Sequence, residues 1–374
     1  MKILLDPQIF IYQRFGGISR YFTEVYILFK KKKNVEIDCP LLYTENLHLK
    51  EYSLFNNYRQ KIVHLSLKLS FTASQRIKEF YKIKSQEKTK QLLRKNQFDL
   101  FFPTYFDPYF LDDIGNTPFV LTVYDMINEI LPHCYKNDTT TIPNKKLLME
   151  KATKIIAISE STKQDIIRLY PHIEAKKIEV VYLGYTINAD HEVELPLPLN
   201  YILFVGNRQE YKNFIFFLKA VTPILKEDSS LYVVCAGGNQ FTKIELDLIN
   251  ELGLSNQIIQ RNFKDSELST YYKKAKCFVF PSEYEGFGIP VLESMACGCP
   301  VVLANHSSFP EVAGDAGVYF ELNNGQDLTN KIKQLLGDEM MRAQYSLKGQ
   351  EQARKFSWEI CAENIYSVLK SVVK

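Results

Sequence analysis

The stretch at residues 281–302, PSEYEGFGIPVLESMACGCPVV, constrains the possible folds more than any other part of the chain. The apolar, β-prone run at 277–280 predicts a buried strand that ends where this stretch begins. Gly286 and Gly288 let the backbone turn and leave room for a ligand to come close. Pro290 suits the first turn of a helix, and the closing apolar run predicts the next strand. A glycine loop that leads into a helix offers free N–H groups and a positive dipole end, which favours an anion such as a diphosphate.

Two carboxylates, Glu285 and Glu293, lie eight residues apart around this loop. One carboxylate accepts two hydroxyl hydrogen bonds, so the pair suits the diol of a ribose or a hexose. On its own, such a spacing usually means two solvated side chains. Here the glycines, the proline and the flanking strands all indicate a phosphate site, and we therefore interpret the pair as ligand-binding.

The same segment resembles the E-x7-E donor-site motif of the glycosyltransferase group 1 family, retaining GT-B enzymes that use nucleotide-diphospho-sugars. The continuation at 307–320, SSFPEVAGDAGVYF, also resembles that family. The resemblance covers most of the chain; it is strong over about 201–320 and patchier before that.

Strand-like apolar runs alternate with helix-length segments along the whole chain, which is typical of parallel α/β domains. The resemblance implies the GT-B fold, an α/β fold in which two Rossmann-like domains face each other across a cleft. We expect an acceptor domain at residues 1–187 and a nucleotide-sugar-binding domain at 188–374, linked by the acidic and proline-rich segment 188–200. The resemblance also implies that the last helix, at about 358–374, crosses back onto the N-terminal domain.

The segment GNRQEYKN at 206–213 follows a predicted buried strand and resembles the family's G-x-R-x4-K-N loop. Arg208 has the planar fork and Lys212 the point charge that suit a diphosphate. Lone surface cations are usually solvated, but this position after a strand favours phosphate contact. No D-x-D-type metal motif stands in a suitable place, since the acidic pair at 112–113 is interpreted as part of a loop. We therefore expect the two cations and the helix dipole behind Gly288 to neutralise the leaving diphosphate, with no metal ion or other cofactor.

In the N-terminal half, Gly16 and Gly17 follow the first predicted strand. Turns of this kind are often only structural, but the order FGGISRYF resembles the family's N-terminal glycine loop, which faces the donor diphosphate. A later strand, at 119–124, ends in Tyr124 and Asp125. Related glycosyltransferases often carry His-Asp here, with the histidine on the donor sugar, so Tyr124 departs from the pattern but still offers a hydroxyl as a candidate sugar contact. Asp125 either orients an acceptor hydroxyl or caps the following turn.

These arguments give a set of expected site residues. The expected catalytic residues are Glu285, Arg208, Lys212 and Asp125. By resemblance, the expected donor-binding residues are Gly16, Gly17, Gly206, Asn207, Asn213, Phe263, Lys264, Gly286, Phe287, Gly288, Ile289, Leu292 and Glu293.

Composition bears on the compartment in which the protein works. The seven cysteines are an odd number and mostly stand in apolar runs, which fits reduced, buried thiols in a cytosolic protein. Cys297 and Cys299 form a C-x-C pair, but small residues at a tight helix end explain it better than a metal does. The chain has no run of 18 apolar residues, and its first ten residues lack a signal-peptide pattern. We expect a cytoplasmic protein that can lie on the inner face of the plasma membrane.

That membrane expectation rests on a basic segment between Lys50 and Lys95, where twelve Lys and Arg residues stand against three Glu. Apolar side chains interleave with them, including Leu65, Leu67, Leu69, Phe71, Phe80 and Tyr81. Such a surface suits an anionic bilayer, and the alternative is one or two solvated helices. Nucleic acid fits less well, because the net charge of the chain is only +3 and no known binding module is present.

Together these features predict a retaining, metal-independent glycosyltransferase that moves a hexose-type sugar from a nucleotide-diphospho-sugar to a glycan. The family's habits favour a lipid-linked acceptor in capsule, exopolysaccharide or O-antigen assembly. Two alternatives stay open: a nucleotide-sugar epimerase of the same fold, and a non-catalytic partner protein, which the departure at Tyr124 encourages. Base, sugar, acceptor and linkage have no readable signal in the sequence.

Overall fold

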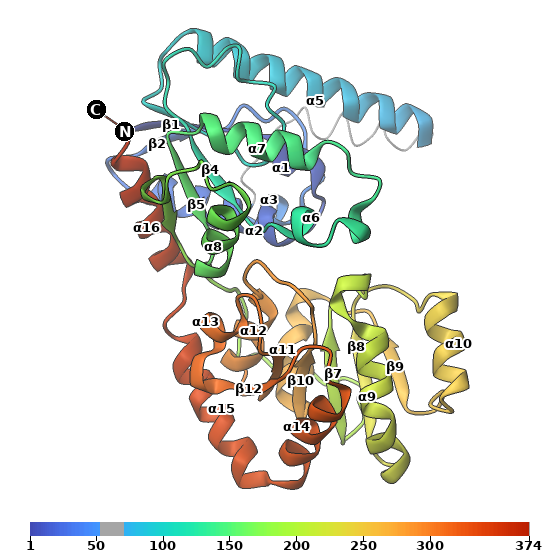
Figure 1. Cartoon of the computed structure of the whole chain (residues 1–374). Helices are drawn as coiled ribbons and strands as arrows, with labels where there is room; N and C mark the ends of the chain where they lie inside the picture. Colours follow the sequence, from blue (N-terminus) through green and yellow to red (C-terminus); the bar gives the residue numbers. More distant parts are fainter. Residues whose placement is uncertain (53–70, 374) are drawn as a thin grey trace.

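Parallel strands form the centre of two α/β units, which lie one above the other in Figure 1. The computed structural model describes residues 1–52 and 71–373, with the backbone alone at 71–74. The basic residues Arg59, Lys61 and Lys68 and the leucines 65, 67 and 69 of the predicted membrane segment lie outside the described residues.

The N-terminal unit is built on two three-stranded parallel sheets, ordered β2-β1-β3 and β4-β5-β6. A parallel bridge between Phe101 and Phe119 joins β3 to the start of β4, so the two sheets continue into each other. The strands are β1 (Lys2–Leu5), β2 (Glu36–Asp38), β3 (Leu100–Phe102), β4 (Val120–Val123), β5 (Lys154–Ala157) and β6 (Ile178–Val180).

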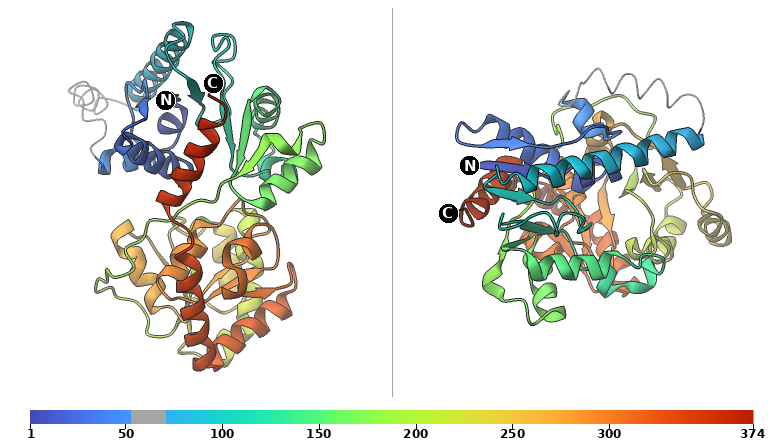
Figure 2. Two further views of the ribbon diagram at one scale, coloured as in Figure 1. Left: turned by 90° about the vertical axis from the view of Figure 1, so that its left-hand side faces the viewer. Right: turned by 90° about the horizontal axis from the view of Figure 1, so that it is seen from above.

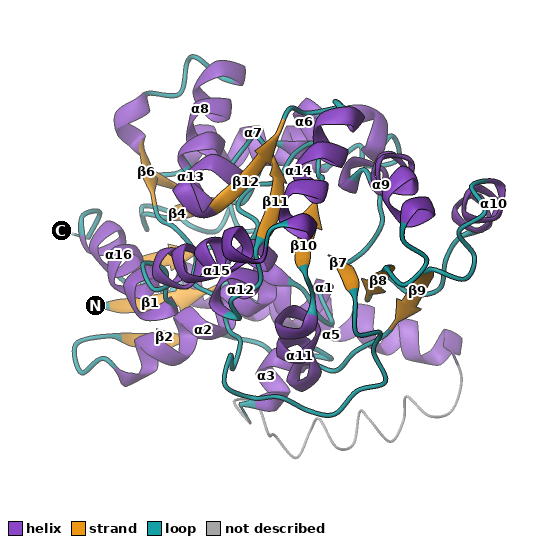
Figure 3. Cartoon of the chain, turned by 90° about the horizontal axis from the view of Figure 1, so that it is seen from below, coloured by secondary structure: helices purple, strands orange, loops and turns teal. Residues whose placement is uncertain are grey.

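The C-terminal unit has one six-stranded parallel sheet with the order β12-β11-β10-β7-β8-β9, seen side by side in Figure 3. Its strands are β7 (Tyr201–Val205), β8 (Tyr232–Ala236), β9 (Ile258–Arg261), β10 (Cys277–Phe280), β11 (Val301–Ala304) and β12 (Gly317–Phe320). The order reverses between the neighbours β7 and β10, and ligands of open α/β sheets bind outside the carboxyl ends of the strands at such a point.

Helices cover the sheets, whose central strands are buried on both faces because they consist of continuous apolar runs. In the N-terminal unit they are α1 (Gln8–Tyr12), α2 (Gly17–Lys31), α3 (Leu47–Glu51), α5 (Phe71–Arg94), α6 (Ile127–Ile130), α7 (Thr141–Lys151) and α8 (Glu160–Leu169), with the 3-10 turns η1 (Pro132–Tyr135) and η2 (Ala175–Lys177). In the C-terminal part they are α9 (Phe214–Glu227), α10 (Lys243–Glu251), α11 (Leu268–Lys274), α12 (Ile289–Ala296), α13 (Phe309–Ala313), α14 (Gly325–Gly337), α15 (Glu339–Ala353) and α16 (Trp358–Lys370), with η3 (Glu210–Lys212), η4 (Asp265–Glu267) and η5 (Gly314–Ala316).

The last helix, α16, leaves the C-terminal unit and packs on α2 of the N-terminal unit (Figure 2). The rings of Trp358 and Tyr21 lie 6.3 Å apart, and Lys32 Nζ lies 2.6 Å from a carboxylate oxygen of Glu363. Trp358 Nε1 also donates to Thr186 Oγ1 at 2.7 Å. The chain therefore passes between the units twice, and the boundary at residues 187 and 188 stays a prediction.

The long helix α5 runs along the side of the N-terminal unit that faces away from the C-terminal unit (Figure 1). Among the described residues, no helix is both long enough and apolar enough to cross a bilayer.

Candidate active site

Two loops meet at the carboxyl ends of the neighbouring strands β7 and β10. The loop after β7 carries Lys212, and the loop after β10 carries Glu285. Their side chains form an ion pair, with 2.5 Å between Lys212 Nζ and Glu285 Oε1, and each is only 13–14% exposed. Lys212 Nζ also lies 4.9 Å from the ring centres of Tyr211 and Phe280. The structure thus brings together two residues that were predicted to act on one donor, at the edge of the sheet where ligands are expected.

The loop that ends at Gly288 is held by two serines to which the sequence argument gave no role. Ser307 Oγ and Ser308 Oγ donate to the carbonyl oxygen of Glu285 at 2.6 and 3.0 Å, and Ser308 also donates to that of Phe287 at 2.9 Å. Gly288 begins α12 with a φ of 95°, in the left-handed region that favours glycine. The loop therefore sets the position of the first turn of α12, where Pro290 has no N–H group and Val291 N already donates to the carbonyl oxygen of Gly288 at 2.9 Å.

A second helix N-terminus faces the first. Gly16 and Gly17 begin α2, and a Cβ built on Gly17 would lie 3.9 Å from Ile289 Cδ1 in the first turn of α12. Both helix starts present the positive end of a dipole, although the N–H groups of Ser19 and Val291 are already bound, by Gln13 Oε1 and by the carbonyl oxygen of Gly288. An anion that lies between α2 and α12 would be stabilised by both units at once.

Arg208, the other predicted phosphate-binding cation, binds a different carboxylate and the backbone of the loop after β8. Its side chain is 3% exposed, and its Nε donates to Glu245 Oε1 at 2.8 Å. The two Nη atoms donate to the backbone carbonyl oxygens of residues 237–240 at 2.9–3.2 Å, and the guanidinium lies 4.7 Å from the ring centre of Phe241. These bonds occupy most of the donors of the guanidinium, so Arg208 fixes the loop after β8 in this conformation, and its predicted contact with a diphosphate stays a prediction.

Tyr124 and Asp125 also take positions other than those first expected of them. Tyr124 is buried, and its hydroxyl donates to the carbonyl oxygen of Thr104 at 2.8 Å, so the expected sugar contact is corrected to a role in the core of the N-terminal unit. Asp125 Oδ1 accepts from Ile127 N at 3.1 Å, which is the turn-capping alternative. Asp125 nevertheless lies at the interface, because a Cβ built on Gly286 of the C-terminal unit would lie 3.0 Å from its Cβ.

The other expected donor-binding residues fall into two groups. Phe287 and Leu292 are buried: Phe287 packs between Tyr182 and Phe356, and Leu292 lies in the core, so neither side chain is available to a ligand. The rest lie at loop surfaces or helix starts of the C-terminal unit: Gly206, Asn207, Asn213, Phe263 and Lys264. Their contacts with a donor stay predictions.

Gly286 lies where the units touch. A Cβ at this position would collide with the carbonyl oxygen of Tyr124 and lie 3.0 Å from the Cβ of Asp125. Because the opposing atom is backbone, only a glycine permits this approach. The approach places the loop after β10 directly against the loop after β4.

We expect Gly286→Ala to lower kcat/KM about tenfold or more while nucleotide binding is kept, because overpacking of this kind costs about 1–3 kcal/mol and here opposes the approach of the two units. Steady-state kinetics and small-angle scattering would measure the two effects. The matched control is Gly337→Ala, since a Cβ at that position meets nothing within 4 Å. Unchanged kinetics with an unchanged radius of gyration would contradict the expectation.

Glu293 lies about one turn into α12, beside a contact that crosses the interface. Arg20 of α2 reaches Asp265 of η4, with 2.8 Å between Nη2 and Oδ2. Burial raises the pKa of Glu293 to about 8; the charge of Arg20 opposes this rise, and that of Asp265 adds to it. Tyr272 of α11 is buried next to Glu293, and its hydroxyl, by hydrogen bonding to the carboxylate, partly opposes the rise in the pKa of Glu293. Burial therefore favours the protonated form of Glu293 when no ligand is bound, which the sequence did not indicate.

This pKa predicts a pH dependence of stability. The folded chain keeps a proton on Glu293 that the unfolded chain releases above pH 4.5, the ordinary pKa of this group. The contribution of Glu293 to the free energy of unfolding is therefore fully present below pH 4.5 and is lost as the pH rises towards 8. The melting temperature of the wild type should therefore fall relative to that of Glu293→Gln across this range, because glutamine does not titrate. Parallel melting curves for the two proteins over that range would contradict the raised pKa.

Contacts between the units include two that local sequence patterns did not indicate. Glu311 of α13 accepts from the backbone N–H groups of Glu160 and Ser161 at 2.7 and 2.9 Å, at the start of α8. The Tyr284 hydroxyl donates to Asp165 at 2.9 Å and accepts from Met126 N at 3.1 Å. The helix start at residue 159 was visible in the sequence, but the carboxylate that binds it comes from the other half of the chain.

Comparison with known proteins adds independent evidence. The model of the family described as "Glycosyl transferases group 1" matches residues 187–352. The chain is 30% identical over 268 residues to the O-antigen chain mannosyltransferase B of Escherichia coli, a match that covers 67% of this chain and 70% of that protein. It is 31% identical over 231 residues to the N-acetylgalactosamine-N,N'-diacetylbacillosaminyl-diphospho-undecaprenol 4-alpha-N-acetylgalactosaminyltransferase of Campylobacter jejuni, which covers 59% of this chain and 62% of that protein.

Among solved structures, that of Anabaena HepE in complex with UDP and glucose is similar over 99% of this chain and 100% of its own, with a TM-score of 0.72 and 18% identity. At this identity the likeness bears on the fold alone, and it confirms the predicted fold of two Rossmann-like units.

Proposed function

Because the chain belongs to the glycosyl transferases group 1 family, we propose that it is a retaining hexosyltransferase that uses a nucleotide-diphospho-sugar donor. The observation that carries this proposal is the Lys212–Glu285 pair, set beside the facing starts of α2 and α12. One cation, two helix dipoles and a carboxylate within one interface suit a sugar diphosphate, which carries both phosphate oxygens and hydroxyl groups.

In this proposal the donor diphosphate lies between α2 and α12, and Lys212 neutralises the charge that develops on it. An ammonium group has three donors, so the pair with Glu285 leaves hydrogen atoms for phosphate oxygens. Glu285 holds hydroxyls of the donor sugar, and Glu293 binds the ribose diol. The bond from the anomeric carbon to the diphosphate breaks through an oxocarbenium-like state, and the acceptor hydroxyl enters on the same face. The protein's own positive charge serves the leaving group, so no metal ion is needed for this step.

The proposed acceptor is a lipid-linked glycan of a bacterial surface polysaccharide. The names of the two relatives support this, since one is an O-antigen chain mannosyltransferase and the other acts on a diphospho-undecaprenol-linked sugar. The exposed face of α5 also supports it, because residues three or four apart on one side of the helix combine cations with apolar side chains. These residues are Arg76, Phe80, Ile83, Lys84 and Lys88; Phe80 is 53% and Ile83 49% exposed.

Flotation with anionic liposomes tests the membrane part. Wild type should float at low salt, and Lys84→Glu with Lys88→Glu should not. The matched control reverses two exposed lysines of the C-terminal unit, Lys219 and Lys243, and should still float. Equal flotation of both double variants, or none of the wild type, would count against a membrane role for α5.

A panel of UDP, GDP, ADP, CDP and dTDP sugars tests the activity itself, scored for thermal stabilisation and for release of nucleoside diphosphate. One donor should stabilise the wild type but not Glu293→Ala or Lys212→Ala. An epimerase would instead yield an isomeric nucleotide-sugar without losing nucleotide. A non-catalytic partner protein would bind none of the panel.

A further inference from the structure

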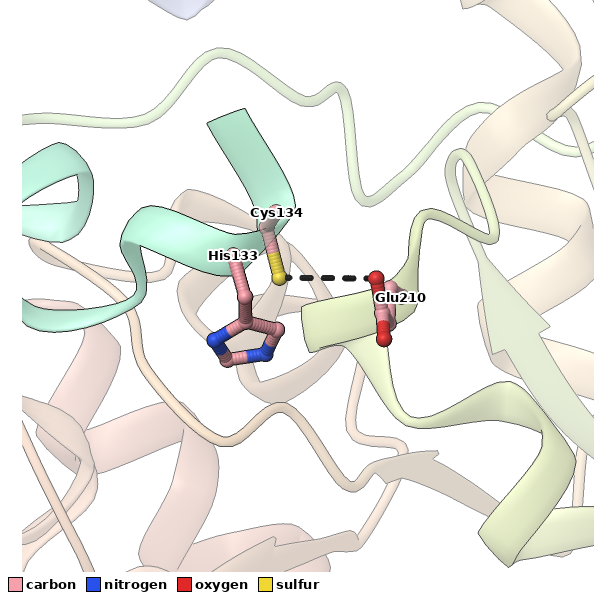
Figure 4. Close-up of side chains that lie close together, drawn as sticks. All are labelled: His133, Cys134 and Glu210. Carbon is pink, nitrogen blue, oxygen red and sulfur yellow. Dashed lines mark hydrogen bonds between the residues drawn. The ribbon is translucent and has the colours of Figure 1, made fainter. Parts of the chain in front are cut away.

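Three potential metal ligands meet at the interface, and none of them is a residue to which the proposed function gives a role in donor binding. His133 and Cys134 stand on η1 of the N-terminal unit, and Glu210 begins η3 of the C-terminal unit (Figure 4). One ligand atom of each lies within 4.8 Å of the others, and Cys134 Sγ lies 3.9 Å from Glu210 Oε2. From these positions we propose that the three side chains bind a zinc ion that joins the two units.

The chemistry of the three ligands favours zinc. A thiolate, an imidazole and a carboxylate are its usual ligands, and three protein ligands with one open position for water form a common zinc site. Bond lengths of about 2.0–2.3 Å in a tetrahedral site require the ligand atoms to be about 3.4–3.7 Å apart. The observed separations, at most 4.8 Å, exceed this by about 1.4 Å or less, and the exposed side chains of His133 and Glu210 can rotate to close the gap.

Other interactions leave these groups available. In the part of the chain that the structure describes, the ring of His133 makes no hydrogen bond, and the carboxylate of Glu210 forms no ion pair and has Cys134 as its partner. Residues 133–138 line an open hollow of about 590 Å³, so an ion can reach the site from solvent. Cys134 is also partly exposed, whereas the six other cysteines are buried.

The ligands come from both units, and this gives the site a conformational consequence. Zinc can bind all three only when η1 lies against η3, so it should favour that arrangement of the units in proportion to its affinity. Glu210 is also two residues from Lys212, within the same 3-10 turn. Zinc would thereby hold the loop of the donor site in place without touching the donor.

Cobalt substitution in tag-free full-length protein tests the site by a readout that does not depend on activity. Wild type should bind one Co²⁺ with a sulfur-to-metal charge-transfer band, which zinc should displace. Cys134→Ser should lose the band, and His133→Asn and Glu210→Gln should each weaken binding at least tenfold. The control His172→Asn removes another half-exposed histidine of the N-terminal unit, one paired with Glu150, and should change nothing.

Limited proteolysis tests whether the zinc ion joins the two units. Zinc should slow proteolysis in the 188–200 segment of the wild type but not of Glu210→Gln, which keeps both ligands of the N-terminal unit. Melting temperatures without metal would show whether each variant is folded. Absence of the band in the wild type, or its persistence in Cys134→Ser, would overturn the site. If Glu210→Gln bound Co²⁺ as tightly as the wild type and zinc protected both proteins equally from proteolysis, the proposed link between the units would be overturned.

Discussion

Replacing Arg208 by alanine should lower the free energy of unfolding by about 3–5 kcal/mol, the usual cost of removing one partner of a buried ion pair. Arg208 and Glu245 are 3% and 7% exposed, so the substitution would leave the carboxylate of Glu245 buried and unpaired. The carbonyl oxygens of residues 237–240 would also lose their donors. Urea denaturation followed by circular dichroism would measure the loss.

Three companion variants sharpen this test. Arg208→Lys keeps the charge but lacks the planar fork, so it should lose less stability than the alanine variant. Removing Glu245 together with Arg208 should restore part of the lost stability, because no unpaired charge is then left. Lys219→Ala removes an exposed cation of α9 and should have almost no effect. A folded Arg208→Ala protein of wild-type stability that had lost its activity would contradict the loop-fixing role and favour the diphosphate contact.

The parts of the fold that depend on local pattern could be predicted from the sequence. The apolar run at 277–280 is β10 as expected, and Gly288 and Pro290 begin α12 as their backbone preferences require. The two-unit α/β fold follows from the repetition of such segments along the chain. Lys212 and Glu285 were assigned to one donor although they are 73 residues apart, and they meet because β7 and β10 are neighbours.

Partners that are distant in sequence set the rest, and no local pattern encodes them. Arg208 binds Glu245, 37 residues further on, where the sequence shows only an ordinary helix start. Tyr124 stands where the family often has histidine, but the space available to it is the core beneath Thr104. The raised pKa of Glu293 likewise depends on burial, which spacing alone does not indicate. Residue type and spacing thus gave the candidate residues, while packing decides which of their polar groups are free.

Because Arg208 is bound within its own unit, a substitution of Lys212 tests the proposed catalysis more directly than a substitution of Arg208. Lys212→Gln should lower kcat/KM about 10²- to 10³-fold, or about 2.7–4 kcal/mol, the effect of removing one group that stabilises a developing oxyanion. Among the residues that the structure describes, Lys212 differs from Arg208 in binding no loop carbonyl and only one carboxylate, so the fold should be affected less than by the change at Arg208. The measurement is steady-state kinetics with the donor found in the panel, with melting temperatures recorded alongside.

Two variants separate the charge of Lys212 from its other effects. Lys212→Arg restores the positive charge in a different shape and should recover part of the activity. Lys219→Gln makes the same change of charge at an exposed position of the same unit and should be fully active. If Lys212→Gln kept full kcat, the charge beside α12 would not act on the leaving diphosphate, and the pair with Glu285 would only hold the two loops together. A large loss of activity in Lys212→Gln, with an intact fold and partial recovery in Lys212→Arg, would instead show that transfer depends on this charge. If the pair were only structural, activity would not depend on whether residue 212 is charged.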